Sequence, residues 1–434
     1  MKQVAIWACF YSVANLVLGQ TPDVSSGKWV PTWTAMPQEV EFWNLPPSPY
    51  TSLFNVFANS TIRQTVHTSL GAASHIRIQI SNTFGPTDLA IDAVTVGLPV
   101  NGSAGVSALE PGTVQEVTFS GEKSFAIPNG VQILSDPIPL PVGPESMLSV
   151  SIYLRQGQQG HRITGHPWSM TTSWLSLGDQ VNALELRDPS AISVEHWYFL
   201  SAVEAWVPSD SKVLVALGDS ITDGAGSTTN ANNRWPDLVL SRLRNSSNPL
   251  FRAIAVVNQA ALGNRATADV QGPSTISRIE RDVLSLPGVQ YAILFEGIND
   301  IGVAEATPQG QFHIYDQLIL AYQQVVAKLH RHGIAVFGAT ITPFGGVAEY
   351  YDAAGEREKC RQRVNQWIRE SGVFDAVLDF DAVLRDENDP TRMKAEYYTG
   401  TGDLIHPGPE GYEAIAAAFP IEIFEQFKDG AGRF

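Results

Sequence analysis

The pattern of hydrophobic and polar residues along the chain changes near residue 210. Before this point, short segments alternate between apolar and polar residues and are separated by Gly, Pro and Asn. Alternation with a period of two is typical of antiparallel strands that bury one face. We therefore predict an all-β sandwich domain over residues 28–208. Its clearest strands are expected at 75–81, 90–98, 114–120 and 147–154.

Beyond residue 210, continuous apolar segments alternate with longer segments of helical periodicity. Strands of a parallel sheet lack polar alternation because helices cover both of its faces. The order predicts a three-layer α/β/α domain with a parallel five-stranded sheet over residues 211–430. The expected strands are 213–218, 253–259, 291–297, 334–340 and 376–380. The expected helices lie near 234–244, 273–285, 314–332, 355–371 and 409–427.

The first residues have the character of a targeting segment. Lys2 precedes an apolar run from Val4 to Leu18, which is short for a membrane span. We expect residues 1–19 to be a cleaved signal peptide and the protein to be secreted into the extracellular space, without a membrane anchor. Three candidate glycosylation sites fit this route and lie at Asn59, Asn101 and Asn245.

Charge and cysteine content narrow the class of protein. The formal net charge is -16 at pH 7, and loss of Lys2 with the signal peptide would make it -17 (-16 minus +1). This balance argues against nucleic acid and anionic membranes as partners, since both are bound through Lys and Arg. Cleavage would leave Cys360 as the one cysteine, so no intramolecular disulfide could form. Its helical spacing with Val364 and Trp367 indicates a buried thiol.

Polar residues and one glycine follow the predicted parallel strands or precede the last helix. These residues are Ser220, Gly263, Asn264, Asn299, Asp403 and His406. In open parallel sheets the ligand binds outside the carboxyl ends of the strands, so we expect one crevice to collect them. Tyr350 and Tyr351, in the loop after the fourth strand, are expected to line this crevice. Both tyrosines and Asn264 are our tentative substrate contacts.

The chemistry of these residue types assigns their roles. The hydroxyl of Ser220 needs a base to become a nucleophile, and His406 is the best placed histidine. Asp403, three residues earlier, can fix the tautomer of the imidazole. The backbone N–H groups of Ser220 and Gly263 and the amide of Asn299 could form an oxyanion hole. Structural alternatives are a helix-capping Ser220, a turn-forming Asn299 and a capping Asp403.

Four motifs carry a family resemblance. "GDSITDG", "NQAALGNR", "EGIND" and "GDLIHP" resemble the four blocks of the GDSL or SGNH hydrolase superfamily. Segments such as "NNRWPDLVLSRL" and "HWYFLSAVEAWVP" resemble a two-domain subgroup of secreted esterases, and the resemblance runs from about residue 28. It implies a flavodoxin-like catalytic domain with Ser220 as nucleophile, His406 as base and Asp403 as its orienter. It also implies Gly263 and Asn299 in the oxyanion hole, and neither a metal nor an organic cofactor.

We therefore expect a secreted serine esterase that hydrolyses short-chain acyl esters, acetyl esters first, through an acyl-enzyme. The expected substrate is an acylated carbohydrate. One alternative is a lipase or phospholipase-type acylhydrolase, although residues 301–313 lack a long apolar lid. Another is a catalytically silent glycan-binding protein. The sequence leaves the natural acyl donor, the leaving alcohol and the oligomeric state open.

Overall fold

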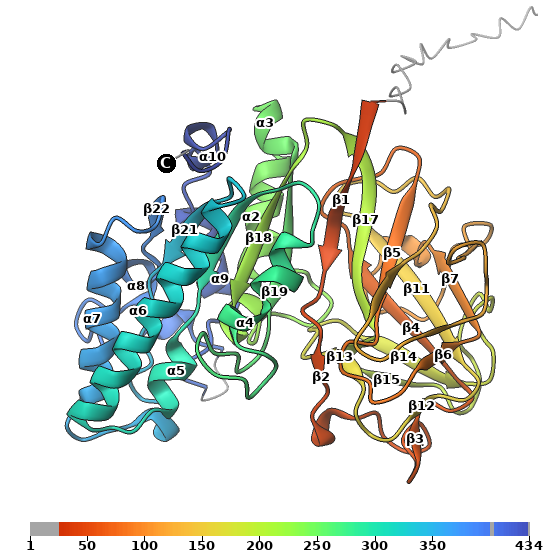
Figure 1. Cartoon of the computed structure of the whole chain (residues 1–434), viewed down its shortest axis with the longest axis horizontal. Coiled ribbons are helices and arrows are strands. Elements are labelled where there is room, and N and C mark those ends of the chain that lie inside the picture. The colour runs from red at the N-terminus through yellow and green to blue at the C-terminus, as the bar shows by residue number, and fades with distance from the viewer. Residues whose placement is uncertain (1–25, 400–402, 433–434) are drawn as a thin grey trace, which may run out of the picture.

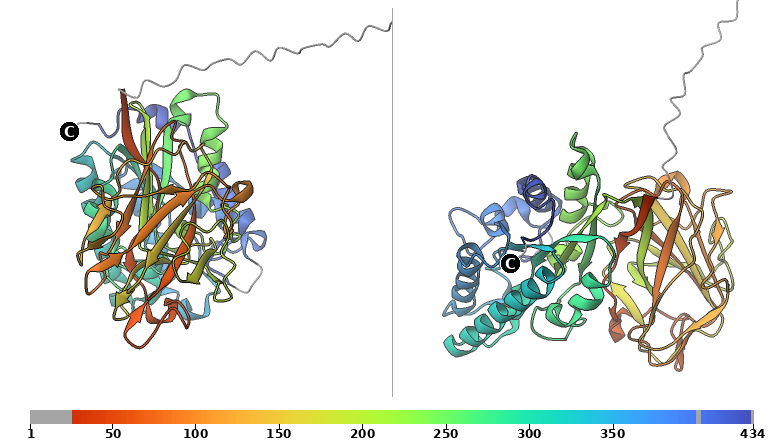
Figure 2. Two further views of the ribbon diagram at one scale, coloured as in Figure 1. Left: turned by 90° about the vertical axis from the view of Figure 1, so that its right-hand side faces the viewer. Right: turned by 45° about the horizontal axis from the view of Figure 1, so that its top comes forward.

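The protein consists of two domains that lie side by side (Figures 1 and 2). The computed structural model describes residues 26–399 and 403–432, so the predicted signal peptide, residues 1–19, lies outside the described residues. The chain passes from the antiparallel β-rich region to the α/β domain between β17 (Leu200–Pro208) and β18 (Lys212–Gly218). The predicted change of fold class near residue 210 is confirmed.

Two antiparallel sheets and several short ribbons form the first domain. One sheet has the order β1 (Gly27–Thr34), β17, β5 (Ile76–Ser81) and β10 (Gln132–Leu134). The other has the order β15 (Ile192–Val194), β14 (Ser173–Leu177), β4 (Ser60–His67), β11 (Met147–Leu154), β7 (Ala93–Gly97) and β8 (Gln115–Glu116). The ribbons are β12 (Gln158–Gln159) with β3 (Asn55–Val56), β6 (Leu89–Ile91) with β9 (Phe125–Ile127), and β16 (His196–Tyr198), β13 (Thr164–Pro167) and β2 (Gln38–Glu39).

The second domain is built on a parallel five-stranded sheet. Its order is β19 (Ile254–Ala260), β18, β20 (Val289–Phe295), β21 (Ala335–Ala339) and β22 (Ala376–Leu378). This is the flavodoxin-like strand order, as predicted. Helices α4 (Thr275–Ile279), α6 (Pro308–His330) and α7 (Glu356–Glu370) form one contacting group, and α2 (Trp235–Arg244), α8 (Phe380–Leu384) and α9 (Pro409–Ala418) form another (Figure 1). None of the helices in the described ranges has the length and apolar character needed to cross a membrane.

Several predicted elements differ in extent from the observed ones. α6 begins at Pro308 rather than near 314, because Thr307 caps it by accepting a hydrogen bond from the N–H of Gly310. The predicted strand 90–98 is divided between β6 and β7, which belong to different sheets. The predicted helix near 409–427 is interrupted at Pro420. The remaining short helices are α1 (Ser220–Asp223), α3 (Pro249–Arg252), α5 (Ile298–Val303), α10 (Ile423–Gln426), the π-helix η4 (Glu280–Leu284) and the 3-10 helices η2 (Phe42–Asn44), η3 (Val100–Gly102), η5 (Ala348–Tyr350) and η6 (Ala395–Tyr397).

The domains meet where β1 lies against β19, the edge strand of the parallel sheet (Figure 1). Thr34 Oγ1 donates to the carbonyl oxygen of Asn258 at 2.8 Å. The N–H of Val256 donates to Ser69 Oγ at 2.7 Å. Hydroxyl groups of the first domain thus pair with outward backbone groups of the edge strand, and one apolar core runs through both domains.

Candidate active site

Ser220 lies at the carboxyl end of the central strand β18. Gly218 ends this strand, and a Cβ there would lie 2.6 Å from the carbonyl oxygen of Phe295. Asp219 then caps α1 by accepting from the N–H of Ile221 at 3.0 Å, and Ser220 is the first residue of that helix. Close strand packing followed at once by a helix cap therefore fixes the serine at the sheet edge.

The structure brings Ser220, His406 and Asp403 together. Ser220 Oγ lies 2.7 Å from His406 Nε2, and His406 Nδ1 lies 2.5 Å from Asp403 Oδ2. The second carboxylate oxygen of Asp403 accepts the N–H groups of Ile405 at 2.9 Å and His406 at 3.1 Å. Because Asp403 accepts from Nδ1–H, Nε2 is left to accept the serine proton, which is the geometry of a Ser-His-Asp triad.

The carboxyl group of Asp403 is ionised at neutral pH. Burial acts to raise its pKa, but the hydrogen bond and charge of His406 and the two backbone N–H groups outweigh burial and lower the pKa to about 2. An ionised Asp403 stabilises the imidazolium that forms when His406 takes the serine proton.

Asn299 is the second residue of α5, the short helix that follows β20. Its Nδ2 donates one hydrogen bond to the carbonyl oxygen of Asn264 at 3.0 Å, which leaves the second N–H of the amide to point elsewhere. Its Oδ1 accepts from the hydroxyl of Tyr350 at 2.9 Å. The two bonds together set which end of the amide carries the donors. Tyr350, expected as a substrate contact, is thus bonded to a predicted oxyanion-hole residue.

Gly263 follows β19 in a left-handed conformation, with φ +68°. A Cβ at this position would lie 1.3 Å from Gln271 Oε1, so the side chain of Gln271 fills the space. We expected a glycine here so that the substrate could approach closely. The structure adds a second reason, because the positive φ and the side chain of Gln271 leave no room for a Cβ. Within the described part of the chain, no acceptor is hydrogen-bonded to the N–H of Gly263 or of Ser220. Both donors remain available to an oxyanion.

The side chain of Asn264 holds the loop after β19, and its tentative assignment as a substrate contact stays a prediction. Its side chain is fully buried. Nδ2 donates to the carbonyl oxygens of Gln271 at 3.0 Å and Pro273 at 2.9 Å, and Oδ1 accepts from Arg278 at 2.9 Å. These bonds tie together the two ends of the loop after β19. A position after a strand does not fix the direction in which the side chain points.

Asp300 holds the same loop from the other side. Its carboxylate accepts the N–H groups of Ala266 at 2.9 Å and Thr267 at 3.1 Å, and the hydroxyl of Thr267 at 2.6 Å. From the sequence, Asp300 is placed after the third predicted strand and given no role. The signal that could have identified its role is its place beside Asn299 in "EGIND".

Buried acids lie around Ser220. Burial raises the pKa of Asp219, Glu296 and Asp300. The charge of Asp300 raises the pKa of Asp219 and of Glu296 further, and the charge of Asp219 adds to the effect on Glu296. Glu296 Oε2 accepts from the hydroxyl of Thr275 at 2.9 Å, and among the described atoms its Oε1 has no hydrogen-bond partner. A raised pKa favours the neutral form of each carboxyl group, and less negative charge around Ser220 would favour an oxyanion there.

The other predicted residues lie at the surface. Tyr351 is exposed over 73% of its area and stays a predicted substrate contact. The candidate glycosylation sites Asn59, Asn101 and Asn245 are all exposed. Across residues 26–399 and 403–432, no group of three His, Cys, Asp or Glu side chains is arranged to hold a metal ion.

One protein-family model matches the part of the chain that contains Ser220 and His406. The model of the "GDSL-like Lipase/Acylhydrolase family" matches residues 216–414, which run from β18 into α9 and include Ser220, Asn299 and His406. No curated protein matches the chain.

Solved structures similar to the chain cover about half of it. A carbohydrate acetylesterase family member from Sinorhizobium meliloti is 14% identical, with 50% of this chain and 99% of that chain covered and a TM-score of 0.38. A catalytic mutant of an acetylxylan esterase from Geobacillus stearothermophilus is 20% identical, with 50% and 94% covered and a TM-score of 0.35. A GDSL-like lipase from Bacteroides thetaiotaomicron is 16% identical, with 50% and 88% covered and a TM-score of 0.34.

Proposed function

Because residues 216–414 of this chain belong to the GDSL-like lipase/acylhydrolase family of carboxylic ester hydrolases, we propose that the protein hydrolyses short-chain acyl esters, acetyl esters of carbohydrates first. The observation that carries this proposal is the continuous chain of contacts from Ser220 Oγ to His406 Nε2 at 2.7 Å and from His406 Nδ1 to Asp403 at 2.5 Å. Three donors are also left without a protein acceptor among the described residues: the backbone N–H groups of Ser220 and Gly263 and the second N–H of the Asn299 amide.

In the acylation step, Ser220 Oγ attacks the carbonyl carbon of the ester while His406 Nε2 takes its proton. The negative oxygen of the tetrahedral intermediate accepts hydrogen bonds from the N–H groups of Ser220 and Gly263 and from the amide of Asn299. When the intermediate collapses, the bond to the leaving alcohol breaks and His406 returns the proton to that alcohol.

In the deacylation step, water attacks the acyl-serine and His406 takes a proton from the water. The second tetrahedral intermediate uses the same three donors as the first. Its collapse breaks the bond between the acyl group and Ser220 Oγ, and His406 returns the proton to that oxygen. The carboxylic acid leaves, and the enzyme regains its starting state.

Two features favour a short acyl group over a long one. Polar side chains lie against the proposed oxyanion donors. Gln271 occupies the space beside Gly263, and the hydroxyl of Tyr350 donates to Asn299. Residues 301–313 also lack the long apolar lid that a lipid interface would require. The acidic net charge disfavours anionic lipid surfaces in addition. A lipase-type acylhydrolase is therefore the second candidate.

The proposal includes secretion after loss of residues 1–19 and glycosylation of the exposed Asn59, Asn101 and Asn245. Expression in a host that glycosylates secreted proteins would test both. The mature amino terminus would be sequenced, and the mass compared before and after glycosidase treatment. Retention of residues 1–19 in the secreted protein, or an unchanged mass, would contradict the respective part of this proposal.

A panel of p-nitrophenyl esters from acetate through butyrate and octanoate to palmitate tests the reaction. We expect acetate to be hydrolysed best, and a fluorophosphonate probe to label Ser220 in the native protein but nothing in Ser220→Ala. A preference for palmitate would favour the lipase, and absence of both turnover and labelling would favour a silent binding protein. Release of acetate from a library of acetylated glycans would then identify the natural substrate.

A further inference from the structure

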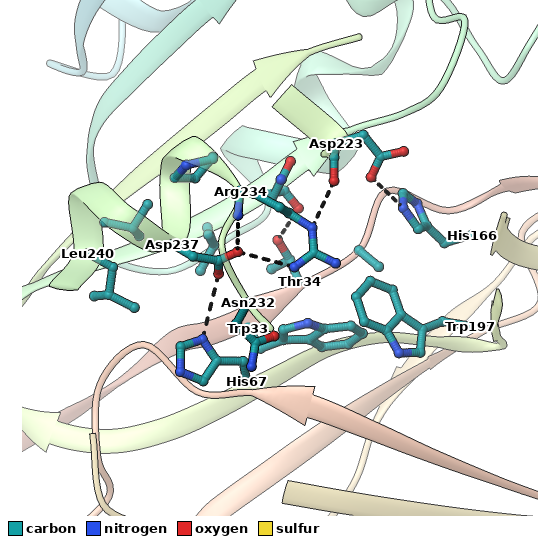
Figure 3. Close-up of a pocket in the computed structure, with 15 residues that line it drawn as sticks. Trp33, Thr34, His67, His166, Trp197, Asp223, Asn232, Arg234, Asp237 and Leu240 are labelled. Carbon is teal, nitrogen blue, oxygen red and sulfur yellow. Dashed lines mark hydrogen bonds and ion pairs between the residues drawn. The ribbon is translucent and has the colours of Figure 1, made fainter. Parts of the chain in front are cut away.

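A small cavity lies between the two domains and is lined by Asp223, the last residue of the helix that Ser220 begins. It has a volume of about 50 Å³ and is lined from the first domain by Trp33, His67 and His166 and from the second by Asp223 and Arg234, among others (Figure 3). Two histidines of the first domain each face an aspartate of the second across it. His166 lies 2.8 Å from Asp223, and His67 lies 3.6 Å from Asp237.

The two ring nitrogens of His166 both face oxygen atoms. Nδ1 lies 3.1 Å from the carbonyl oxygen of Met36, and Nε2 lies 2.8 Å from Asp223 Oδ1. The carbonyl oxygen of Met36 is an acceptor, and so is Asp223 when it is ionised, in which state both ring nitrogens carry protons. His166 is therefore an imidazolium that pairs with the carboxylate of Asp223, and this ion pair is almost completely buried.

The surroundings agree with a charged His166. Burial acts to lower the pKa of His166, and Arg234 lowers it further, but Asp223 and the carbonyl oxygen of Met36 raise it above its ordinary value overall. The neighbouring His196 is affected in the opposite direction, since burial and the charge of His166 lower its pKa to about 4.

Asp223 links two parts of the proposed oxyanion hole. It is the last residue of α1, the helix that Ser220 begins. While Oδ1 faces His166, Oδ2 accepts the backbone N–H of Leu262 at 2.9 Å. Leu262 directly precedes Gly263. One carboxylate therefore joins the helix of the nucleophile to the loop that carries another oxyanion donor.

Arg234 cannot easily replace His166 as the partner of this carboxylate. Its Nε donates to the backbone oxygen of Asp223 at 2.8 Å, and its Nη1 donates to Asp237 at 3.1 Å. Its Nη2 donates to the carbonyl oxygen of Ser169 in the first domain. To bond the Asp223 carboxylate, Arg234 would have to give up one of these buried contacts.

We propose that His166 of the β domain is a positioning residue for catalysis, which orients the Asp223 carboxylate and thereby sets the N–H of Gly263 relative to Ser220. This role rests on the proposed esterase function. A buried carboxylate that loses its charged partner is strongly disfavoured, and it rotates or takes up a proton or water. Rotation would release Leu262 N–H and shift the adjacent oxyanion donor, where a displacement of about 1 Å can cost about 100-fold in rate.

Two amide substitutions of His166 test whether a hydrogen bond to Asp223 is needed, because both are polar but only one is long enough to reach Asp223. In His166→Gln, the longer amide can place its NH₂ near the former Nε2 and still donate to Asp223. In His166→Asn, the shorter amide reaches only the position of Nδ1 and the carbonyl oxygen of Met36. His67→Asn is the matched control, because it breaks the other interdomain His–Asp contact, which does not touch Ser220 or the loop of Gly263.

Each variant of the full-length protein would be assayed for kcat and KM with p-nitrophenyl acetate, for the rate of fluorophosphonate labelling and for Tm. We expect His166→Asn to lose about 10- to 100-fold in kcat and in labelling rate, with KM changed less than about 3-fold. His166→Gln should recover most of this loss. His67→Asn should lower Tm but leave kcat and the labelling rate unchanged.

The proposal fails if His166→Asn keeps the wild-type kcat and labelling rate, or if His67→Asn loses as much of both as His166→Asn does. Equal losses in His166→Asn and His166→Gln would also overturn it, since reach to Asp223 would then not matter. If His166→Asn does not fold, His166→Gln decides: a partial loss of kcat and labelling rate at unchanged Tm, absent from His67→Asn, supports the positioning role, whereas wild-type kcat and labelling rate in His166→Gln overturn it. A wild-type protein without turnover or labelling would instead refute the esterase function.

Discussion

Replacement of Tyr350 by Phe isolates one hydrogen bond of the proposed oxyanion hole. The substitution removes the hydroxyl that donates to Asn299 Oδ1 at 2.9 Å. The ring should stay in place, because it packs edge-on against Phe344 with centroids 5.7 Å apart and lies over Gly302, where a Cβ would come within 2.4 Å of it. Burial raises the pKa of Tyr350 to about 12, so the hydroxyl of the native protein is a proton donor at neutral pH.

The expected loss is that of one neutral hydrogen bond, about 0.5–1.5 kcal/mol. This corresponds to a decrease in kcat of about 2- to 13-fold, since about 1.4 kcal/mol is tenfold in rate. The loss stays below that of removing Asn299, because Nδ2 still donates to the carbonyl oxygen of Asn264. A flipped amide would turn its oxygen towards that carbonyl oxygen, so the remaining bond resists the flip.

Steady-state kinetics of Tyr350→Phe with p-nitrophenyl acetate would measure this effect, alone and combined with Asn299→Ala. If Tyr350 acts through Asn299, the second substitution should cost nothing further in the Asn299→Ala background. An increase in KM at constant kcat would show instead that the hydroxyl binds the substrate, as the sequence first suggested. The same loss of kcat in both backgrounds would refute the coupling to Asn299.

Three further substitutions or reactions have defined outcomes. Asn299→Ala should remain folded and lose about 10²–10³ in kcat with little change in KM, and a change confined to KM would exclude an oxyanion donor. Gly263→Ala should lower both Tm and kcat, because φ is +68° and Gln271 occupies the Cβ position, whereas the control Gly121→Ala, with φ +83° and open space around it, should lower Tm only. Burial raises the pKa of Cys360 to about 12, so iodoacetamide at pH 8 should modify it slowly in the native protein and rapidly in denaturant, as followed by peptide mass spectrometry. Rapid modification of the native protein would show that α7 opens readily.

The parallel sheet could be predicted closely from the sequence. Continuous apolar segments mark strands that are buried on both faces, and β18, β19 and β21 begin and end within one residue of the predicted bounds. The rule that ligands bind at carboxyl strand ends then brought Ser220 and His406 into one site, although 186 positions separate them in the chain.

The directions of side chains could not be predicted in the same way. Asn264 follows a strand as Ser220 does, but its amide turns back to bond Arg278 and the loop. The role of His166 could not be predicted, because its partner Asp223 lies in the other domain, 57 positions away. Such contacts depend on tertiary packing, which neither hydrophobic periodicity nor motif spacing describes.

Thr34 and Ser69 cover backbone groups of β19 to which a strand of another molecule could otherwise pair. Exposed strand edges promote association between molecules and, at high concentration, aggregation. The β domain therefore protects the parallel sheet against self-association along this edge. Substitutions that loosen the contact of β1 with β19 should reduce the yield of dispersed protein before they alter the turnover of the molecules that remain. Loss of solubility, rather than loss of specific activity, would be the first sign of a weakened interface.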